Sequence, residues 1–176
     1  MRKINILLLG DGGTGKTSFV NYISYGNVFS EKYVPTLGTE IVHVNTGLTD
    51  KVNCVIYKCF FKIYDTAGHD KFTGHVSAPD TDVIIITYSC KNRITHRSIQ
   101  KWTQIARQDM QLYDVPILKV GTNYDYCTHE TCDGCQWGKE TLKIIDPEAI
   151  NVSFKDGTNW PESNKFKKSG TVTLFR

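Results

Sequence analysis

The stretch Gly10-Asp11-Gly12-Gly13-Thr14-Gly15-Lys16-Thr17 decides the expected fold of this chain of 176 residues. It fits the pattern G-x-x-x-x-G-K-[ST] at every specified position. An apolar run at residues 3–9 precedes it, and a helical pattern at residues 17–24 follows it. Glycine lets the backbone adopt positive φ angles, so successive N–H groups can point inward at a helix N-terminus and bind an anion. The stretch therefore predicts a phosphate-binding loop between a strand and a helix, rather than a glycine turn without a ligand.

Two side chains of this loop have separate predicted tasks. Lys16 supplies a positive charge to the β- and γ-phosphates of a nucleotide, and Thr17 supplies a hydroxyl ligand to Mg²⁺. The residues of this stretch expected to bind the nucleotide are Asp11, Gly12, Gly13, Thr14, Gly15, Lys16, Thr17 and Ser18. The motif predicts a nucleoside triphosphate with Mg²⁺, but it does not select the base.

Outward from this loop, apolar runs alternate with helical and polar segments. Strands are expected at residues 3–9, 40–45, 52–64, 83–88, 116–121 and 150–153, a turn at 46–50, helices at 17–24 and 94–112, and a loop at 124–138. Nearly continuous apolar runs, as at 83–88 and 116–121, are typical of buried parallel strands. The alternation predicts an α/β fold with a doubly wound, mostly parallel six-stranded sheet and helices on both faces. We expect a single domain over residues 1–176.

The overall composition limits the classes of partner. The net charge is +3 with 22% charged residues, which is only mildly basic and does not favour nucleic acid or a membrane surface. The apolar run near the N-terminus is too short for a signal or a membrane span, and we recognise no lipidation signal. We therefore expect a soluble, unanchored monomer in the cytoplasm or nucleus, with its six cysteines reduced.

Thr122-Asn123-Tyr124-Asp125 follows the strand expected at residues 116–121 and is interpreted as a base-reading loop of the N-x-x-D type. A carboxylate can accept hydrogen bonds from both donors on the Watson–Crick edge of guanine, and adenine has no such pair. Asp125 therefore predicts selection of guanine. We expect Asn123 to tie this loop to the base and to the phosphate loop.

Asp65-Thr66-Ala67-Gly68 closes the strand expected at residues 52–64. An acidic residue at the carboxyl end of a neighbouring strand can hold Mg²⁺ through water. Gly68 can offer its N–H to a γ-phosphate and permits the backbone to reorient. The segment is therefore predicted to sense the third phosphate.

Taken together, these motifs resemble those of the Ras superfamily of small GTPases. The stretches at residues 10–20, 29–38 and 65–74 are most similar to the Ran branch, and the resemblance spans roughly residues 3–160. It implies a GTP/GDP switch with slow hydrolysis of GTP and a role in nucleocytoplasmic transport. It also implies that effector, exchange-factor and GTPase-activating proteins bind near residues 29–40 and 66–77.

The resemblance implies further roles for single residues. Phe29 matches the aromatic ring that clamps guanine, and Tyr33 lies in the same nucleotide-binding segment. Thr36 matches the threonine whose hydroxyl reaches Mg²⁺ and whose N–H reaches the γ-phosphate, with Gly68 as its partner. The implied metal ligands are Thr17, Thr36 and Asp65, and the implied catalytic residues are Lys16, Thr36, Gly68 and His69. Ser153, Phe154 and Lys155 occupy the place of a Ser-Ala-Lys loop whose middle N–H binds the guanine carbonyl.

Several residues depart from the family pattern around the nucleotide. His69 replaces the glutamine that orients the attacking water, and Phe154 replaces an alanine. Tyr124 replaces a lysine whose stem covers the base, and we expect its ring to stack there instead. Residues 161–176 form a divergent C-terminal segment, in which glycine and β-branched residues predict a short or degenerate helix.

These departures leave alternatives open. The chain could hold nucleotide, or a partner, without useful turnover, and a P-loop kinase is the least favoured function because no lid segment is evident. Cys127, Cys132 and Cys135, with His129 between them, have spacing near that of a zinc site. We favour thiols without a metal, because the loop is short and no hairpin is evident.

Overall fold

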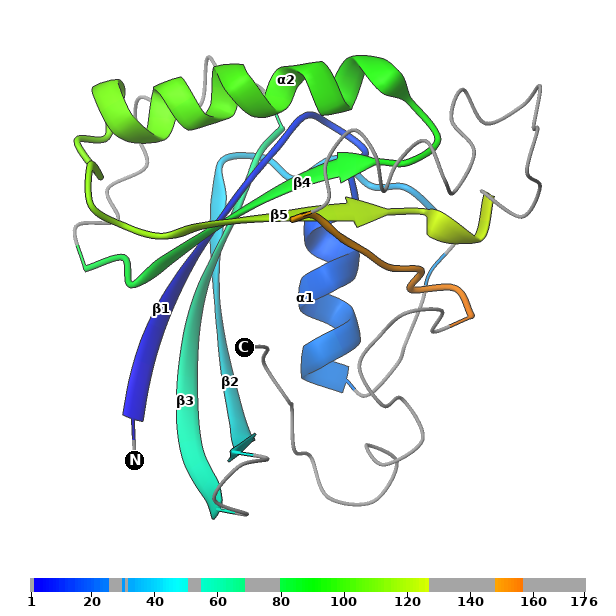
Figure 1. Cartoon of the computed structure of the whole chain (residues 1–176). Helices are drawn as coiled ribbons and strands as arrows, with labels where there is room; N and C mark the ends of the chain where they lie inside the picture. Colours follow the sequence, from blue (N-terminus) through cyan, green and yellow to red (C-terminus); the bar gives the residue numbers. More distant parts are fainter. Residues whose placement is uncertain are drawn as a thin grey trace.

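The computed structural model describes residues 2–25, 30, 32–50, 55–68, 80–126 and 148–156. Its centre is a six-stranded sheet with the order β2-β3-β1-β4-β5-β6 (Figure 1). The strands are β1 (Arg2–Leu9), β2 (Thr39–Asp50), β3 (Val55–Thr66), β4 (Val83–Ser89), β5 (Ile117–Thr122) and β6 (Ile150–Asn151). β2 runs antiparallel to β3, and every other neighbouring pair is parallel. The mostly parallel sheet confirms the predicted fold class.

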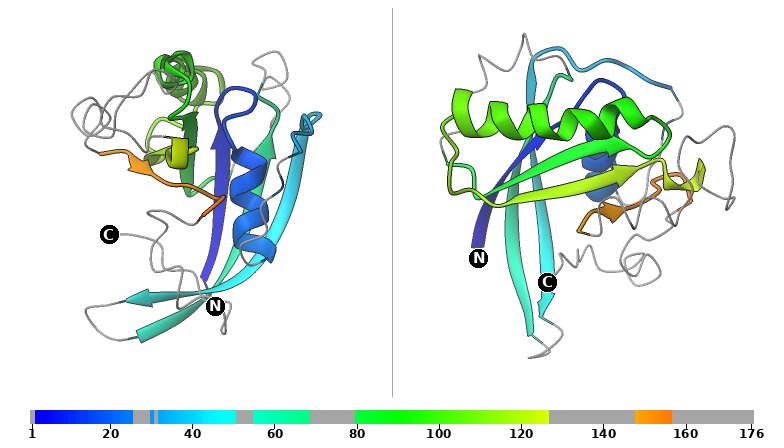
Figure 2. Two further views of the ribbon diagram at one scale, coloured as in Figure 1. Left: turned by 90° about the vertical axis from the view of Figure 1, so that its right-hand side faces the viewer. Right: turned by 45° about the horizontal axis from the view of Figure 1, so that its top comes forward.

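Helices α1 (Lys16–Tyr25) and α2 (Arg93–Gln104) cover opposite faces of this sheet (Figure 2). Alternate residues of each central strand point to opposite faces, so β1 directs Leu7 and Leu9 toward α2 and Ile6 and Leu8 toward α1. Trp102, which is 1% exposed, is the largest side chain in the cluster beneath α2. Two apolar cores therefore hold the carboxyl ends of the central strands in place.

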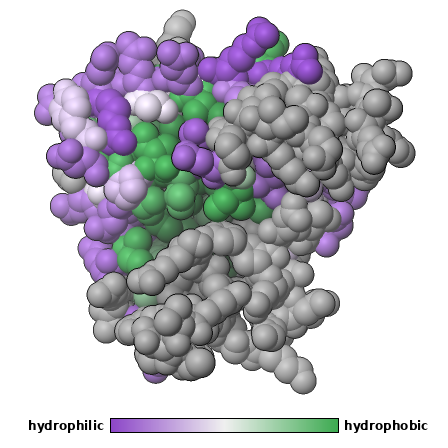
Figure 3. Space-filling view, in the orientation of Figure 1, coloured by the Kyte–Doolittle hydropathy of each residue, from purple (hydrophilic) through white to green (hydrophobic). Residues whose placement is uncertain are grey.

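The outer surface of α2 is polar. Asn92 caps the helix, because its side chain accepts a hydrogen bond of 3.0 Å from the N–H of Ile94. The space-filling view shows hydrophilic side chains along α2 and an apolar area over the sheet beneath it (Figure 3).

In the described part of the chain, no helix has the length and apolar character needed to cross a membrane.

The turn expected at residues 46–50 is wrong. β2 continues through this segment, and its last residue, Asp50, pairs with Val55 of β3. Within this segment Gly47 lies opposite Lys58 in the ladder. Pairing along the whole of β3 outweighs the low strand propensity of single residues, which is a weak and context-dependent preference.

The other predicted boundaries shift by small amounts. The helix expected at residues 94–112 is divided into α2 and one π-helical turn, η2 (Ile105–Asp109), which is followed by a hydrogen bond of 3.0 Å from Met110 N to Ile105 O. The last strand ends at Asn151, because Ser153 already belongs to a side-chain-capped turn. Residues 161–176 lie outside the described residues, so the prediction for the C-terminal helix stays a prediction.

Candidate functional site

The phosphate-binding stretch forms the connection from β1 to α1, as predicted. Gly10, Gly13 and Gly15 have φ angles of 141°, 73° and 83°, in the region that favours glycine. A Cβ atom at Gly10 would stand 2.4 Å from the carbonyl oxygen of Thr87, so no side chain fits there. α1 begins at Lys16 and has no acidic residue in its first turn. No acidic residue of the helix itself therefore offsets the positive end of its dipole, which favours an anion at this place.

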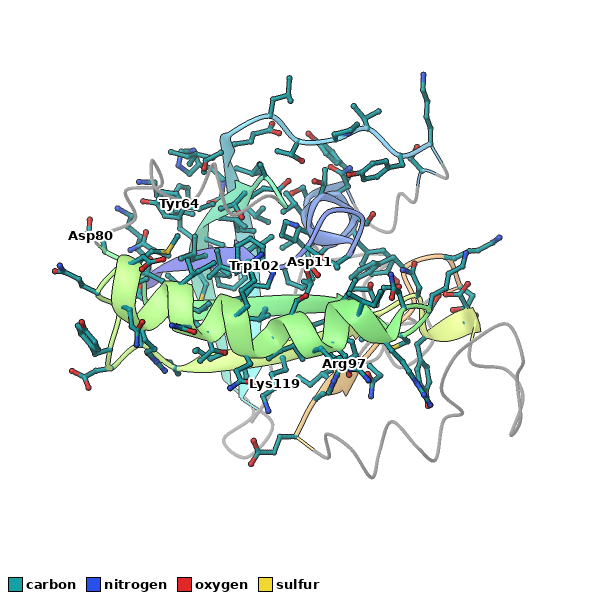
Figure 4. The ribbon with its side chains drawn as sticks, turned by 90° about the horizontal axis from the view of Figure 1, so that it is seen from above. Asp11, Tyr64, Asp80, Arg97, Trp102 and Lys119 are labelled. Carbon is teal, nitrogen blue, oxygen red and sulfur yellow. The ribbon has the colours of Figure 1, made fainter. Side chains whose placement is uncertain are left out.

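Hydrogen bonds from three elements fasten this loop from outside. Trp102 of α2 donates its indole N–H to Asp11 Oδ1 at 2.8 Å (Figure 4). The hydroxyls of Thr14 and Thr87 share a hydrogen bond of 2.7 Å, which joins the loop to β4. Thr122, at the end of β5, donates its hydroxyl to the Thr14 carbonyl at 2.9 Å. Sequence reasoning missed all of these outer partners, because no motif contains both members of a pair.

Lys16 lies in the floor of the loop and is 5% exposed. Its Nζ donates to the carbonyl oxygens of Gly10 at 2.7 Å and Asp11 at 2.9 Å. Burial lowers the pKa of Lys16 to about 8, although the charges of Asp65 and Asp11 oppose this shift. Because carbonyls neutralise an ammonium only in part, the position favours a phosphate as the remaining partner.

Oxygen atoms from three segments converge beside Lys16. Thr17 donates its hydroxyl to Asp65 Oδ2 at 2.7 Å, and its hydroxyl shares a hydrogen bond of 2.9 Å with that of Thr36. Asp65 is 1% exposed, and its other oxygen, Oδ1, is buried without a hydrogen-bond partner in the described residues. Burial raises the pKa of Asp65, while the Thr17 hydrogen bond and Lys16 oppose the rise. This all-oxygen set, with one orphaned carboxylate oxygen, fits a hard divalent cation such as Mg²⁺.

Gly68 closes the site from the end of β3. A Cβ atom there would stand 2.2 Å from the backbone nitrogen of Gly12, so only glycine allows this approach. The N–H of Ala67 donates to Gly38 O at 2.7 Å, which links this segment to the one that carries Thr36. The resulting pocket of about 300 Å³ is lined by residues that include Gly13, Ser18, Tyr33, Asn123 and the Lys16, Thr17, Thr36 and Gly68 discussed above.

A model of the Ras family matches residues 5–168, which is most of the chain. The chain belongs to the Ras family. Ras-family proteins are small GTPases that bind GTP and GDP and act as switches, so the nucleotide class predicted from the motifs is confirmed at this level. The match covers the phosphate loop, the Asp65 segment and both loops assigned to the base.

The base-reading loop of this Ras-family chain requires a correction. The tie to the phosphate loop, expected from Asn123, is made by Thr122 through its hydroxyl. Asn123 has a φ angle of 55°, lines the pocket and donates its Nδ2 to Ser89 Oγ at 2.9 Å. The sequence did contain the signal for this register. The N-x-x-D pattern has two residues between its asparagine and its aspartate, but only Tyr124 lies between Asn123 and Asp125. A motif that ends at Asp125 therefore begins at Thr122.

The expected stacking of Tyr124 on the base is also wrong, because the motif begins one residue earlier than expected, at Thr122. Its side chain is 6% exposed and belongs to the apolar cluster beneath α2, together with Tyr88 and Trp102. It is not among the residues that line the pocket. η3 (Tyr124–Tyr126) follows β5 after one intervening residue, and the side chain of Tyr124 packs into the core rather than lining the pocket.

The second base loop joins the opposite core. Phe154 is 5% exposed and packs on α1, with its ring centroid 6.2 Å from that of Phe19 and 5.3 Å from that of Tyr22. This packing provides the room that the larger ring requires. Ser153 Oγ accepts hydrogen bonds from the N–H groups of Lys155 and Asp156, at 3.2 and 3.4 Å. The two base loops meet where Tyr124 N donates to Val152 O at 3.2 Å.

Some predicted residues do not meet the pocket or cannot be placed. Besides Tyr124, the predicted and described residues that are not among the lining residues are Asp11, Thr14, Asp65, Asp125, Ser153, Phe154 and Lys155. Asp125 is half-buried. Phe29 and His69 lie outside the described residues, as do Cys127, His129, Cys132 and Cys135 of the zinc alternative. Within the described ranges, no group of acidic, histidine and cysteine side chains forms a metal cluster.

Proposed function

We propose that this chain is a guanine-nucleotide switch in which the γ-phosphate controls the surface at residues 32–40. The observation that carries the proposal is the junction of Thr17, Thr36 and Asp65, where the segment of Thr36 meets the phosphate loop through a hydroxyl pair at 2.9 Å. That segment exposes Val34 by 65% and Leu37 by 88%. A ligand that holds or releases Thr36 therefore changes an exposed apolar surface, which suits recognition by effector and regulator proteins.

Each ligand group has a proposed partner in the chain. Lys16 and the N–H groups of residues 12–17 bind the phosphates, while Thr17, Thr36 and Asp65 hold Mg²⁺, directly or through water. Bound Mg²⁺ supplies positive charge to the β- and γ-phosphate oxygens. Asp125 reads the guanine donors, with Phe29 and the Phe154 N–H completing the base site. Asn123 reaches the same pocket, and its amide replaces the cation that the resemblance implied at this place.

Hydrolysis is proposed to be slow, with His69 at the place where the resemblance implies a water-orienting glutamine. A neutral imidazole has one donor and one acceptor, and an imidazolium has no acceptor. The alternative function is a nucleotide holder without useful turnover. Single-turnover hydrolysis by the parent and by His69→Gln across about pH 6.5 separates the two, because that is the reference pKa of histidine. A parent rate that falls as the pH drops through this range, together with a higher rate in the variant, supports the switch. No turnover in either protein supports the holder.

The base assignment is tested by what the protein carries and by Asp125. Denatured protein should release GDP or GTP into the supernatant, identified by ion-exchange chromatography. Asp125→Asn should weaken GTP and favour xanthosine triphosphate, because the new amide donor faces a carbonyl on xanthine instead of a donor on guanine. Lys58→Ala is the matched control for a remote charge change and should keep the parent's preference. An Asp125→Asn protein that still prefers GTP contradicts the proposed base site.

The proposal includes the cellular process in which the switch acts. We propose a role in transport between nucleus and cytoplasm, because residues 10–20, 29–38 and 65–74 resemble the Ran branch. A pull-down with the GTP-analogue and GDP forms tests this placement, because transport factors should bind only the former. Equal recovery of partners with both forms contradicts the switch itself.

A further inference from the structure

Asp11 is the only acidic residue in the phosphate-binding stretch. A carboxylate within a few ångströms of a phosphate repels it, and the repulsion is stronger where water is excluded. The structure directs this side chain away from the ligand: Asp11 does not line the pocket, whereas Gly12 and Gly13 on its C-terminal side do. Its orientation therefore matters for anion binding.

Among the described residues, one buried donor binds this carboxylate. Trp102 Nε1 donates to Asp11 Oδ1 at 2.8 Å, and Trp102 is 1% exposed in the cluster beneath α2 (Figure 4). An indole N–H can only donate, and an ionised carboxylate can only accept. Because neither group can exchange roles, and because core packing fixes the ring, the Asp11 carboxylate must turn toward Trp102 to make this hydrogen bond.

The backbone of Asp11 connects this bond to the catalytic end of the site. The carbonyl of Asp11 accepts from Lys16 Nζ at 2.9 Å and from the Thr14 hydroxyl at 2.8 Å. Gly68 packs on the same peptide: a Cβ atom there would stand 2.5 Å from the carbonyl carbon of Asp11. A change in the backbone dihedral angles at Asp11 would therefore move the groups that meet Lys16 and Gly68.

We propose that Trp102 is a positioning residue of the nucleotide site, which holds the Asp11 carboxylate out of the phosphate pocket and fixes the 11–12 peptide against Gly68. This inference rests on the proposed guanine-nucleotide binding and extends it to α2, an element that carries none of the sequence motifs. It assigns the Asp11–Trp102 pair a role in nucleotide affinity, with the larger effect on the triphosphate because Gly68 is the proposed γ-phosphate contact.

The test is a double-mutant cycle read by the release of fluorescent GDP and of a fluorescent, non-hydrolysable GTP analogue. Trp102→Phe keeps a large ring but removes the donor, and should speed release of GDP roughly tenfold and of the GTP analogue more, since hydrogen bonds to charged groups have this magnitude. Asp11→Ala, combined with Trp102→Phe, removes the released carboxylate and should recover part of the loss. Ile99→Val loosens the same core without contacting Asp11 and is the matched control.

The cycle separates positioning from packing. If Trp102 only fills the core, then adding Asp11→Ala cannot reverse the faster nucleotide release of Trp102→Phe. The effects of the two substitutions on release should then add, as they do for independent sites. Additive effects, or unchanged release by Trp102→Phe, overturn the proposal. If Trp102→Phe melts at a lower temperature than the Ile99→Val control, the test uses Asp11→Ala alone, which leaves the core intact. This variant should shift the indole ¹⁵N–¹H resonance of Trp102. An unshifted resonance also overturns the proposal.

Failure of the proposed function has a different signature. A parent protein that binds no guanine nucleotide contradicts the function. The four members of the cycle, which are the parent, Trp102→Phe, Asp11→Ala and the double variant, are then titrated with pyrophosphate, which lacks a base. Weaker pyrophosphate binding by Trp102→Phe, recovered in the double variant, still supports the positioning role. Equal pyrophosphate affinity in all four proteins overturns it.

Discussion

The phosphate end and the base end of the site are built in different ways. At the phosphate end we propose that backbone N–H groups contact the ligand, while the side chains of Asp11 and Thr14 fasten the loop to α2 and β4. At the base end the side chains of Tyr124 and Phe154 are buried in the cores on opposite faces of the sheet. The comparison shows that the phosphate end is a polar frame held by hydrogen bonds, whereas the base end is held by apolar packing.

The largest expected effect is a side chain at Gly10. Gly10→Ala places a methyl group 2.4 Å from the Thr87 carbonyl at a φ of 141°, and should lower the free energy of unfolding by roughly 4 kcal/mol and abolish GDP binding. Gly13→Ala is the matched control, because its φ is 73° but nothing lies within 4 Å of the new Cβ. It should cost about 1–2 kcal/mol. Urea unfolding without nucleotide measures both, and equal costs would refute the role of close approach.

Removing the Phe154 ring tests the base end in the same way. Phe154→Ala leaves a cavity against Phe19 and Tyr22, and should lower the free energy of unfolding by roughly 3 kcal/mol. Pyrophosphate affinity should stay within a factor of about two, since the phosphate loop keeps its own hydrogen bonds. Tyr113→Ala, at a 61% exposed aromatic, is the control with little expected change. Loss of pyrophosphate binding in folded Phe154→Ala would mean that the two ends are not independent.

The buried Lys16 predicts how affinity depends on pH. Without ligand its pKa is about 8, and bound phosphates favour the charged form, so GDP affinity should fall above about pH 8, by up to roughly tenfold per pH unit. The unliganded protein should become more stable as the pH rises from about 8 to the ordinary lysine pKa of 10.5, because its buried ammonium loses its charge before that of the unfolded chain. Isothermal titration and urea unfolding at each pH measure the two trends.

Lys16→Ala is the reference for this pH series. It should bind GDP roughly ten- to a hundredfold more weakly near neutral pH, because charge-assisted contacts to the phosphates are lost. Its remaining pH dependence comes from the nucleotide and from other groups. A parent curve parallel to that of Lys16→Ala would exclude Lys16 as the titrating group.

The smallest expected effect is at the proposed cation ligand. Burial raises the pKa of Asp65 above its ordinary value of 3.8. In the unliganded protein, the free energy of unfolding therefore falls as the pH rises from 3.8 to the raised pKa, because the folded state must give up a proton that the unfolded chain has already lost. Asp65→Asn should therefore raise the free energy of unfolding at neutral pH by about 1 kcal/mol, a size common for stabilising changes at functional sites. The same variant should lose the Mg²⁺ dependence of GDP release, measured with and without EDTA.

Glu40→Gln is the matched control for Asp65→Asn. Glu40 is exposed and lies opposite Asp65 in the β2–β3 register, so the change removes the same charge from the neighbouring position. It should keep the Mg²⁺ dependence and change the stability less. If both variants lose the Mg²⁺ effect, then general charge near the site, rather than coordination by Asp65, explains the result.

Much of this site was predictable because its motifs are local. The strand before Gly10, the helix after Lys16 and the carboxylate at the end of β3 follow from apolar periodicity and from residue type. The structure brings Lys16, Thr17, Thr36 and Asp65 together as expected. The errors at Asn123 and Tyr124 arose because one residue of register decides which side chains face the pocket and which face the core.

The sequence by itself determined the fold class and the anion-binding loop, because the alternation of strands and helices and the chemistry of the loop follow from patterns within short segments. The antiparallel extension of β2 to Asp50, the burial of Tyr124 and Phe154, and the bond from Trp102 to Asp11 were decided only by the tertiary structure. Each of these depends on a partner far away in the chain, such as the indole 91 residues beyond Asp11. Only the packing of α2 and the strands brings such partners within hydrogen-bond or van der Waals distance.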